Sequence, residues 1–168
     1  MKTITVLKTL INIYYYLMIV ALVAGFITIP LLLFTNQPYT MSLFGNQIDI
    51  GELSIGKSIT VITLLGLVLY FYFRAIQVMR NTVKELVDGH YFSESVITNF
   101  KKMGTLFLIC GIGFFVVNII LKLLLENRLS FGLDFSLFLF VITGLFFLFL
   151  SEVFKVAKDA TEENNLTI

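Results

Sequence analysis

RAIQVMRNTVKELVDGHYFSESVITNFKKM, residues 74–103, is the only long polar interval of this 168-residue chain that combines helical patterning, turn residues and clustered charge. Ile76, Met79 and Val83 recur at helical spacing and continue the pattern of the preceding apolar run. A continuous helix over residues 58–88 would be about 46 Å long, whereas the hydrocarbon core of a bilayer is roughly 30 Å thick. The sequence therefore predicts a helix that leaves the membrane and projects beyond it.

A tight corner is predicted to follow this helix. Gly89 can adopt the left-handed conformation that ends a helix. Ser93 can cap the next helix, and Glu94 lies favourably in its first turn, near the positive end. Phe92 and Ile97 occupy the two positions of a hydrophobic staple. These signals together predict a helix, a short turn and a second helix.

The composition points to a membrane protein. Hydrophobic residues make up 58% of the chain and charged residues only 14%, whereas soluble domains contain close to a quarter charged residues. The net charge of +1 comes from mixed and dispersed charges, so direct nucleic-acid binding is not expected.

The apolar runs predict a single all-α domain over residues 1–168, with four transmembrane helices. The first run is about twice as long as the apolar part of a signal peptide and is read as a retained helix. The predicted spans are residues 10–34, 58–76, 103–125 and 135–154. A helical corner at 77–102 and a tail at 155–168 lie outside the membrane. Helices 2, 3 and 4 extend into the cytoplasm, and a short extracytoplasmic β-hairpin around Gly45 is predicted between helices 1 and 2.

The distribution of basic residues predicts the orientation. Nine of the twelve lysines and arginines fall on the side of the corner and both termini. The other three, Lys57, Lys122 and Arg128, fall on the opposite side. By the positive-inside rule both termini and the corner are cytoplasmic. The nine are Lys2, Lys8, Arg74, Arg80, Lys84, Lys101, Lys102, Lys155 and Lys158.

The sequence contains little that suggests catalysis or cofactor binding. One cysteine, Cys110, and one histidine, His90, cannot form a multi-ligand zinc or bis-histidine haem site. No catalytic triad, phosphate loop or paired-carboxylate site is present, so we expect no enzyme, no cofactor and no metal. Glu152 lies at the inner end of the fourth helix and Arg74 at the matching point of the second, so the two are predicted to form an ion pair near the interface.

Patterned charge concentrates on the predicted cytoplasmic side, which favours a regulatory or interaction protein that presents the corner and the C-terminal tail to a partner. The candidate partner surface consists of Arg80, Lys84, Asp88, His90, Phe92, Ser93, Glu94 and Lys101. The alternative is a subunit of an oligomeric small transporter or pore lined by Asn12, Thr63, Asn118 and Thr143. An accessory subunit of a larger membrane complex is a third hypothesis.

Two short motifs resemble a known family. The corner DGHYFSESVITNFKKMG at residues 88–104 and the ending EENNLTI at 162–168 are similar to the bacterial domain of unknown function 2975 family, uncharacterised four-helix membrane proteins. The resemblance implies a location in the bacterial inner membrane. Because such genes often lie beside small helix-turn-helix regulators, it also implies a small transcriptional regulator as a candidate partner. It implies no established activity.

Overall fold

The computed structural model describes residues 2–34, 40–43, 46–49, 54–126 and 135–165. Within these residues, four long helices follow one another along the chain, and two short strands lie between the first two. The helices are α1 (Lys2–Phe34), α2 (Ile55–Val87), α3 (Glu94–Glu126) and α4 (Phe135–Asn165). Each helix is long and apolar enough to cross a membrane, so the fold is that of a multi-pass membrane protein.

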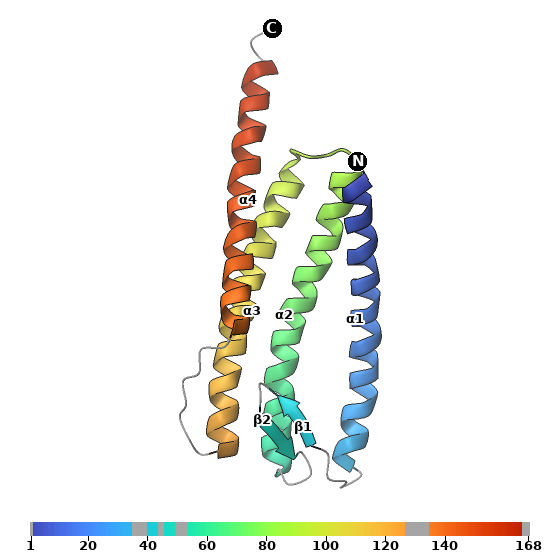
Figure 1. Ribbon diagram of the computed structural model, residues 1–168, viewed down its shortest axis with the longest axis vertical. Coiled ribbons are helices and arrows are strands. Elements are labelled where there is room, and N and C mark those ends of the chain that lie inside the picture. The colour runs from blue at the N-terminus through green and yellow to red at the C-terminus, as the bar shows by residue number, and fades with distance from the viewer. Residues whose placement is uncertain (1, 35–39, 44–45, 50–53, 127–134, 166–168) are drawn as a thin grey trace.

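The helices pack mainly in the order of the chain: α1 contacts α2, α2 contacts α3, and α3 contacts α4 (Figure 1). The start of α1, the corner between α2 and α3 and the end of α4 lie at one end of the molecule, which we call the corner end (Figure 1). Strands β1 (Thr40–Leu43) and β2 (Asn46–Asp49) lie at the opposite end and pair antiparallel, with Thr40 opposite Asp49.

Two helices are longer than the sequence predicts. The first span is predicted from residue 10, but α1 begins at Lys2, so it also outlasts the hydrocarbon thickness. The fourth helix is predicted to pass its apolar span and end at about Lys158, but α4 continues to Asn165. Its added turns contain the i,i+4 pair Lys158 and Glu162, which favours helix over coil.

Phenylalanines at seven-residue spacing join α3 to α4. Rings from one helix alternate with rings from the other, with centroids 5.1–6.2 Å apart. A repeat of seven keeps the same side of each helix facing its partner. The rings are those of Phe100, Phe107 and Phe114 on α3, and of Phe140, Phe147 and Phe154 on α4.

Small residues between these rings let the two helices approach closely. A Cβ atom at Gly104 would lie 2.7 Å from the carbonyl oxygen of Gly144, and one at Gly144 would lie 3.0 Å from the carbonyl oxygen of Gly104. One heptad beyond Gly144, the buried hydroxyl of Ser151 donates a hydrogen bond to the carbonyl oxygen of Ile97 at 2.9 Å. Close backbone approach through small residues is a common way for helices to associate within lipid.

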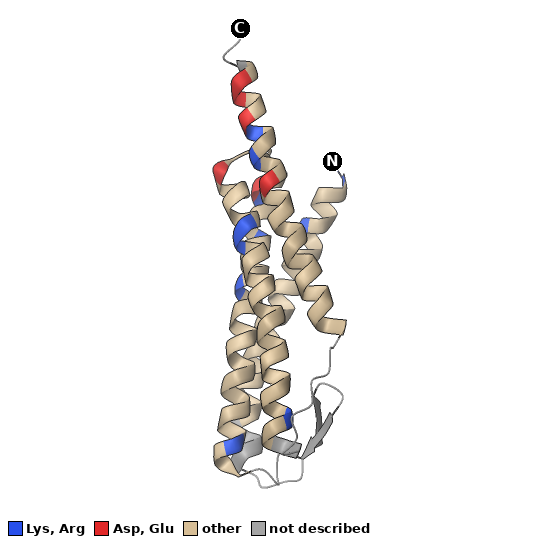
Figure 2. Ribbon diagram, turned by 90° about the vertical axis from the view of Figure 1, so that its left-hand side faces the viewer, with Lys and Arg blue, Asp and Glu red and all other residues tan. Residues whose placement is uncertain are grey.

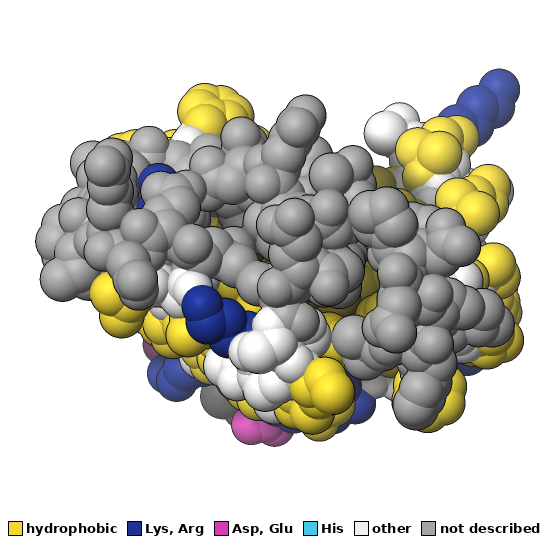
Figure 3. Space-filling view, turned by 90° about the horizontal axis from the view of Figure 1, so that it is seen from below, with side chains coloured by type: hydrophobic (Ala, Val, Ile, Leu, Met, Phe, Trp, Pro, Cys, Tyr) yellow, Lys and Arg dark blue, Asp and Glu magenta, His cyan; other side chains and the backbone are white. Residues whose placement is uncertain are grey.

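Apolar side chains face outward over much of the molecule. On α1, for example, Val20, Val23 and Phe26 are exposed. Hydrophobic side chains also line the margin of the molecule when it is viewed from the end opposite the corner (Figure 3). Such an apolar exterior is what a bilayer solvates, which agrees with four membrane-crossing helices.

Candidate interaction site

The corner between α2 and α3 is fixed by its backbone. Gly89 has φ +90°, the left-handed region that glycine enters without steric cost. Its amide donates to the carbonyl oxygen of Leu86 at 3.3 Å, and the amide of His90 donates to that of Glu85 at 3.1 Å. These two bonds form a Schellman motif and satisfy the last carbonyls of α2. The predicted stop at Gly89 is confirmed.

Ser93 caps the N-terminus of α3, as predicted. Its hydroxyl accepts a hydrogen bond from the amide of Val96 at 3.2 Å and donates to the carboxylate of Glu85 at 3.2 Å. The other oxygen of Glu85 accepts from the hydroxyl of Ser95 at 2.8 Å. A carboxylate at a helix N-terminus is electrostatically favourable, so Glu85 joins the end of α2 to the start of α3. This role of Glu85 was not predicted from the sequence.

Phe92 connects the corner to α4. Its ring centroid lies 5.8 Å from that of Phe154, which continues the series of phenylalanines between α3 and α4. The staple between Phe92 and Ile97 stays a prediction. Lys84, Asp88, His90 and Glu94, also part of the predicted partner surface, are exposed at the corner end.

Arg80 does not form part of that exposed surface, contrary to the prediction. Its Nε donates to Asn12 Oδ1 at 2.7 Å and its second guanidinium nitrogen donates to the Tyr16 hydroxyl at 3.2 Å. The guanidinium carbon lies 4.7 Å from the ring centroid of Tyr15 and 5.2 Å from that of Tyr16. A planar, delocalised cation suits both stacking on aromatic rings and forked hydrogen bonding. Arg80 therefore attaches α1 to α2.

Tyrosine side chains add to this attachment. The hydroxyls of Tyr14 and Tyr72 are 2.7 Å apart, and the ring of Tyr15 stacks on Phe73 with centroids 5.3 Å apart. All three consecutive tyrosines of α1 thus contact α2.

The predicted ion pair between Arg74 and Glu152 does not form among the described residues. Arg74 instead donates to the Oε1 atom of Gln77 on its own helix at 2.6 Å. The physical reason is the register of the two helices. Tyr72, two residues before Arg74, contacts Phe140 of α4 with ring centroids 5.9 Å apart, whereas Glu152 lies about 18 Å of helix beyond Phe140. Both side chains are exposed.

A cleft of about 750 Å³ opens between α2 and α3 below the corner. Three basic side chains, Arg74, Lys101 and Lys102, line it, and none of its lining residues is acidic. Of the predicted surface, only Lys101 belongs to this cleft. Its remaining lining residues are Tyr70, Phe71, Gln77, Val78, Asn81, Thr98, Asn99, Thr105 and Leu106.

This cleft was not predicted from the sequence, although the spacing of polar residues on the two helices indicates it. Polar residues recur at three- and four-residue spacing on both helices, from Arg74 to Asn81 and from Thr98 to Thr105. Such spacing puts each set on one face. Only the pairing of the two faces in the folded molecule turns them into one site.

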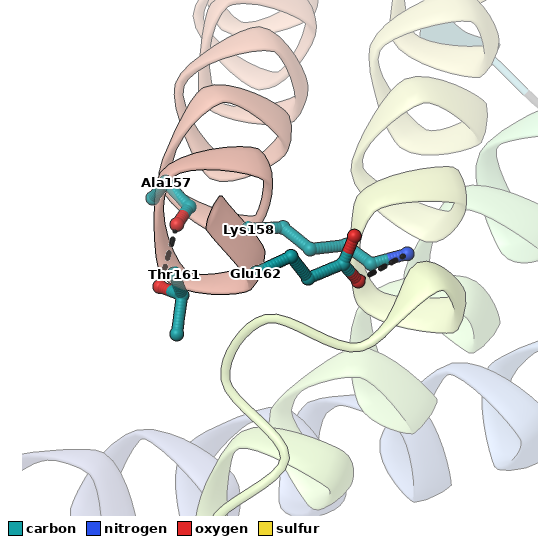
Figure 4. A network of polar contacts seen from close by, with 4 residues as sticks. All are labelled: Ala157, Lys158, Thr161 and Glu162. Carbon is teal, nitrogen blue, oxygen red and sulfur yellow. Dashed lines mark hydrogen bonds and ion pairs between the residues drawn. The ribbon is translucent and has the colours of Figure 1, made fainter. Parts of the chain in front are cut away.

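The end of α4 projects beyond the corner (Figures 1 and 2). Phe154 is the last residue in the series of phenylalanines that joins α4 to α3, and Val156 is 67% exposed. Within the projecting part, Lys158 Nζ lies 3.6 Å from Glu162 Oε1, and the Thr161 hydroxyl donates to the carbonyl oxygen of Ala157 at 2.7 Å (Figure 4). These polar contacts stay within the helix itself.

Charged side chains of both signs lie at the corner end (Figure 2). The projecting end of α4 carries Lys155 and Lys158 as well as Asp159, Glu162 and Glu163. The part of the chain that the structure describes has no group of three or more His, Cys, Asp or Glu side chains that could hold a metal ion. The charged and polar side chains at this end can take part in ionic and hydrogen-bonded recognition.

Comparison with known proteins gives one match. A family model described as "Protein of unknown function (DUF2975)" matches residues 54–168. No curated protein and no solved structure matches the chain. The matched residues include the corner, the cleft and the projecting end of α4, and they leave out α1. The match agrees with the resemblance that the corner and C-terminal motifs indicate.

Proposed function

Because the chain belongs to the DUF2975 family of proteins of unknown function, we propose a function from its geometry: a non-enzymatic interaction protein of the bacterial cytoplasmic membrane. It presents the projecting end of α4, together with the adjacent corner, to a cytoplasmic protein. The small regulators implied by the family resemblance are candidates for that partner.

The distribution of charge supports the orientation. The corner end carries nine of the twelve lysines and arginines of the sequence, and both ends of the described chain lie there. Basic residues next to membrane spans favour the cytoplasmic side. This orientation leaves β1 and β2 outside the cytoplasm.

The single observation that carries the proposal is the uncovered end of α4. Residues 155–165 form about 16 Å of helix beyond the last ring contact with α3. These residues continue a helix that is already formed, so they need no new nucleus, but most of their side chains are exposed and they rely on pairs such as Lys158 and Glu162 within the helix itself. Val156 within this segment and Val153 just before it are both exposed and lie three residues apart, on one face of the helix. A bound partner would cover that face and stabilise the helix.

The experiment places a photo-cross-linking amino acid at Val156 of the full-length protein in living cells. The matched control carries it at Leu139, an exposed apolar residue within the apolar span of the same helix. We expect a discrete protein adduct from position 156 that position 139 does not give and that unlabelled protein with an intact α4 competes away. The proposal fails if position 156 gives no protein adduct or gives the same products as position 139.

The transporter hypothesis has less support from the geometry. Of the polar residues on which it rests, Asn12 accepts a hydrogen bond from Arg80 and Thr63 donates to the carbonyl oxygen of Ile59 on its own helix. Asn118 is buried on α3. These residues lie on three different helices and are engaged or enclosed, which favours the interaction function.

A further inference from the structure

We propose that the basic cleft between α2 and α3 binds the phosphate-bearing headgroup of an anionic phospholipid from the leaflet at the corner end. This inference goes beyond the proposed protein partner. It uses a different surface, since none of the residues that line the cleft belongs to the projecting end of α4.

The charge of the cleft selects an anion. Arg74, Lys101 and Lys102 line it without an acidic neighbour among the lining residues. Both lysines are exposed, and neither ammonium group has a hydrogen bond or an ion pair in the described part of the chain. Arg74 uses one nitrogen on Gln77, which leaves its other donors available. Three cations held at one place on a membrane protein favour a ligand with net negative charge.

Uncharged polar groups complete the lining on the corner side. Asn81 of α2 and Thr98 and Asn99 of α3 contribute amide and hydroxyl groups. Such groups hydrogen-bond to phosphate oxygens and to headgroup hydroxyls. The headgroup would therefore meet both charge and hydrogen-bond donors.

The opposite side of the cleft is apolar, and this distinguishes a lipid from a soluble phosphate. Tyr70, Phe71 and Leu106 line the part directed toward the membrane-spanning portion of the helices. From Tyr70 to Asn81 the lining follows α2 for about 16 Å, which exceeds the thickness of one headgroup layer. A ligand that fills the cleft is thus polar and anionic at one end and apolar at the other.

The test is native mass spectrometry of the purified full-length protein with phosphatidylglycerol or phosphatidylcholine. The cleft variant is K101Q/K102Q, and the matched control is K155Q/K158Q, which removes the same charge from the projecting end of α4. We expect the wild type to retain phosphatidylglycerol in preference to phosphatidylcholine. The preference should fall about thirtyfold in the cleft variant and less than about twofold in the control.

Several results would overturn the proposal. They are a wild-type protein without preference for phosphatidylglycerol, a cleft variant that keeps the preference, and an equal loss in both variants. A further arm adds glycerol phosphate: displacement of the lipid at equal concentration would assign the cleft to a soluble phosphate instead. Protection of the buried Cys110 thiol from a thiol-reactive dye verifies that each variant is folded.

Discussion

Replacing Gly104 with alanine tests the close contact between α3 and α4. The added Cβ would lie 2.7 Å from the carbonyl oxygen of Gly144 and 2.7 Å from Cγ of Leu148. A leucine side chain can rotate, but the carbonyl oxygen is part of the α4 backbone. Raising that distance to an ordinary contact of 3.4 Å requires α3 and α4 to separate by about 0.7 Å. Such a separation also loosens the neighbouring phenylalanine contacts.

The expected cost follows from two opposing effects. Inserting a methyl group into a packed interface costs about 1–3 kcal/mol, and alanine returns up to about 1 kcal/mol because it favours helix more than glycine does. Because the backbone carbonyl oxygen cannot rotate away from the new methyl group, we take the upper half of the first range, and subtracting about 1 kcal/mol leaves a net loss of unfolding free energy of about 1–2 kcal/mol. For a chain of this size that lowers the melting temperature by about 2–8 °C.

The protein carries its own reporter for this measurement. Cys110 is the only cysteine and is fully buried, so a thiol-reactive dye labels it when the helices separate. The labelling midpoint on heating in detergent should fall for G104A. The matched control is G66A, because a Cβ at Gly66 has no atom within 4 Å and should leave the midpoint unchanged or raise it.

The reasoning is refuted if G104A melts at or above the wild-type temperature. It is also refuted if G66A loses as much stability as G104A, since the effect would then not depend on the contact with Gly144.

Three further substitutions use the same dye assay. R80K keeps the charge but loses the forked hydrogen bonding to α1, and it should lower the unfolding free energy by about 1–3 kcal/mol. The control R74K, on the exposed face, should change the unfolding free energy by less than about 0.5 kcal/mol. Equal effects of the two substitutions would contradict the attachment role of Arg80. G89A forces a side chain into φ +90° and should cost about 1–2 kcal/mol, and an unchanged midpoint would argue against this conformation. S151A removes the hydrogen bond to Ile97 and should cost about 0.5–1.5 kcal/mol; a rise in stability would show that this bond contributes nothing.

The corner could be predicted from the sequence because its determinants are local. A left-handed glycine and a serine cap act within a few residues of their own position, so Gly89 and Ser93 suffice to end one helix and begin the next. The predicted bounds of α2 and α3 are accordingly close to those observed. The end of α4 was mispredicted because polarity was read as loss of helix, although an i,i+4 ion pair supports helix there.

The contact between α3 and α4 was not recognised although its seven-residue spacing is present in the sequence. These helices are apolar on all sides, so hydrophobicity alone does not distinguish the face that meets a partner helix from the face that meets lipid. The useful signal is residue size: phenylalanine and glycine alternate along one face of α3, as at Phe100, Gly104, Phe107 and Gly111. In a membrane, close packing rather than hydrophobicity selects such a face.

Arg74 and Arg80 show why charge on α2 cannot be assigned a role from sequence alone. They are six residues apart, so they point roughly 120° away from each other around the helix. Arg80 faces α1, where an asparagine, a tyrosine hydroxyl and two aromatic rings satisfy its guanidinium. Arg74 faces the cleft, where its neighbours are lysines and one glutamine. A cation whose hydrogen-bonding and stacking partners lie within the protein stabilises the fold. A cation that lies beside other cations is instead stabilised when an anion binds. The ligand-binding charge of this protein is therefore expected at Arg74 and the lysines beside it, and not at Arg80.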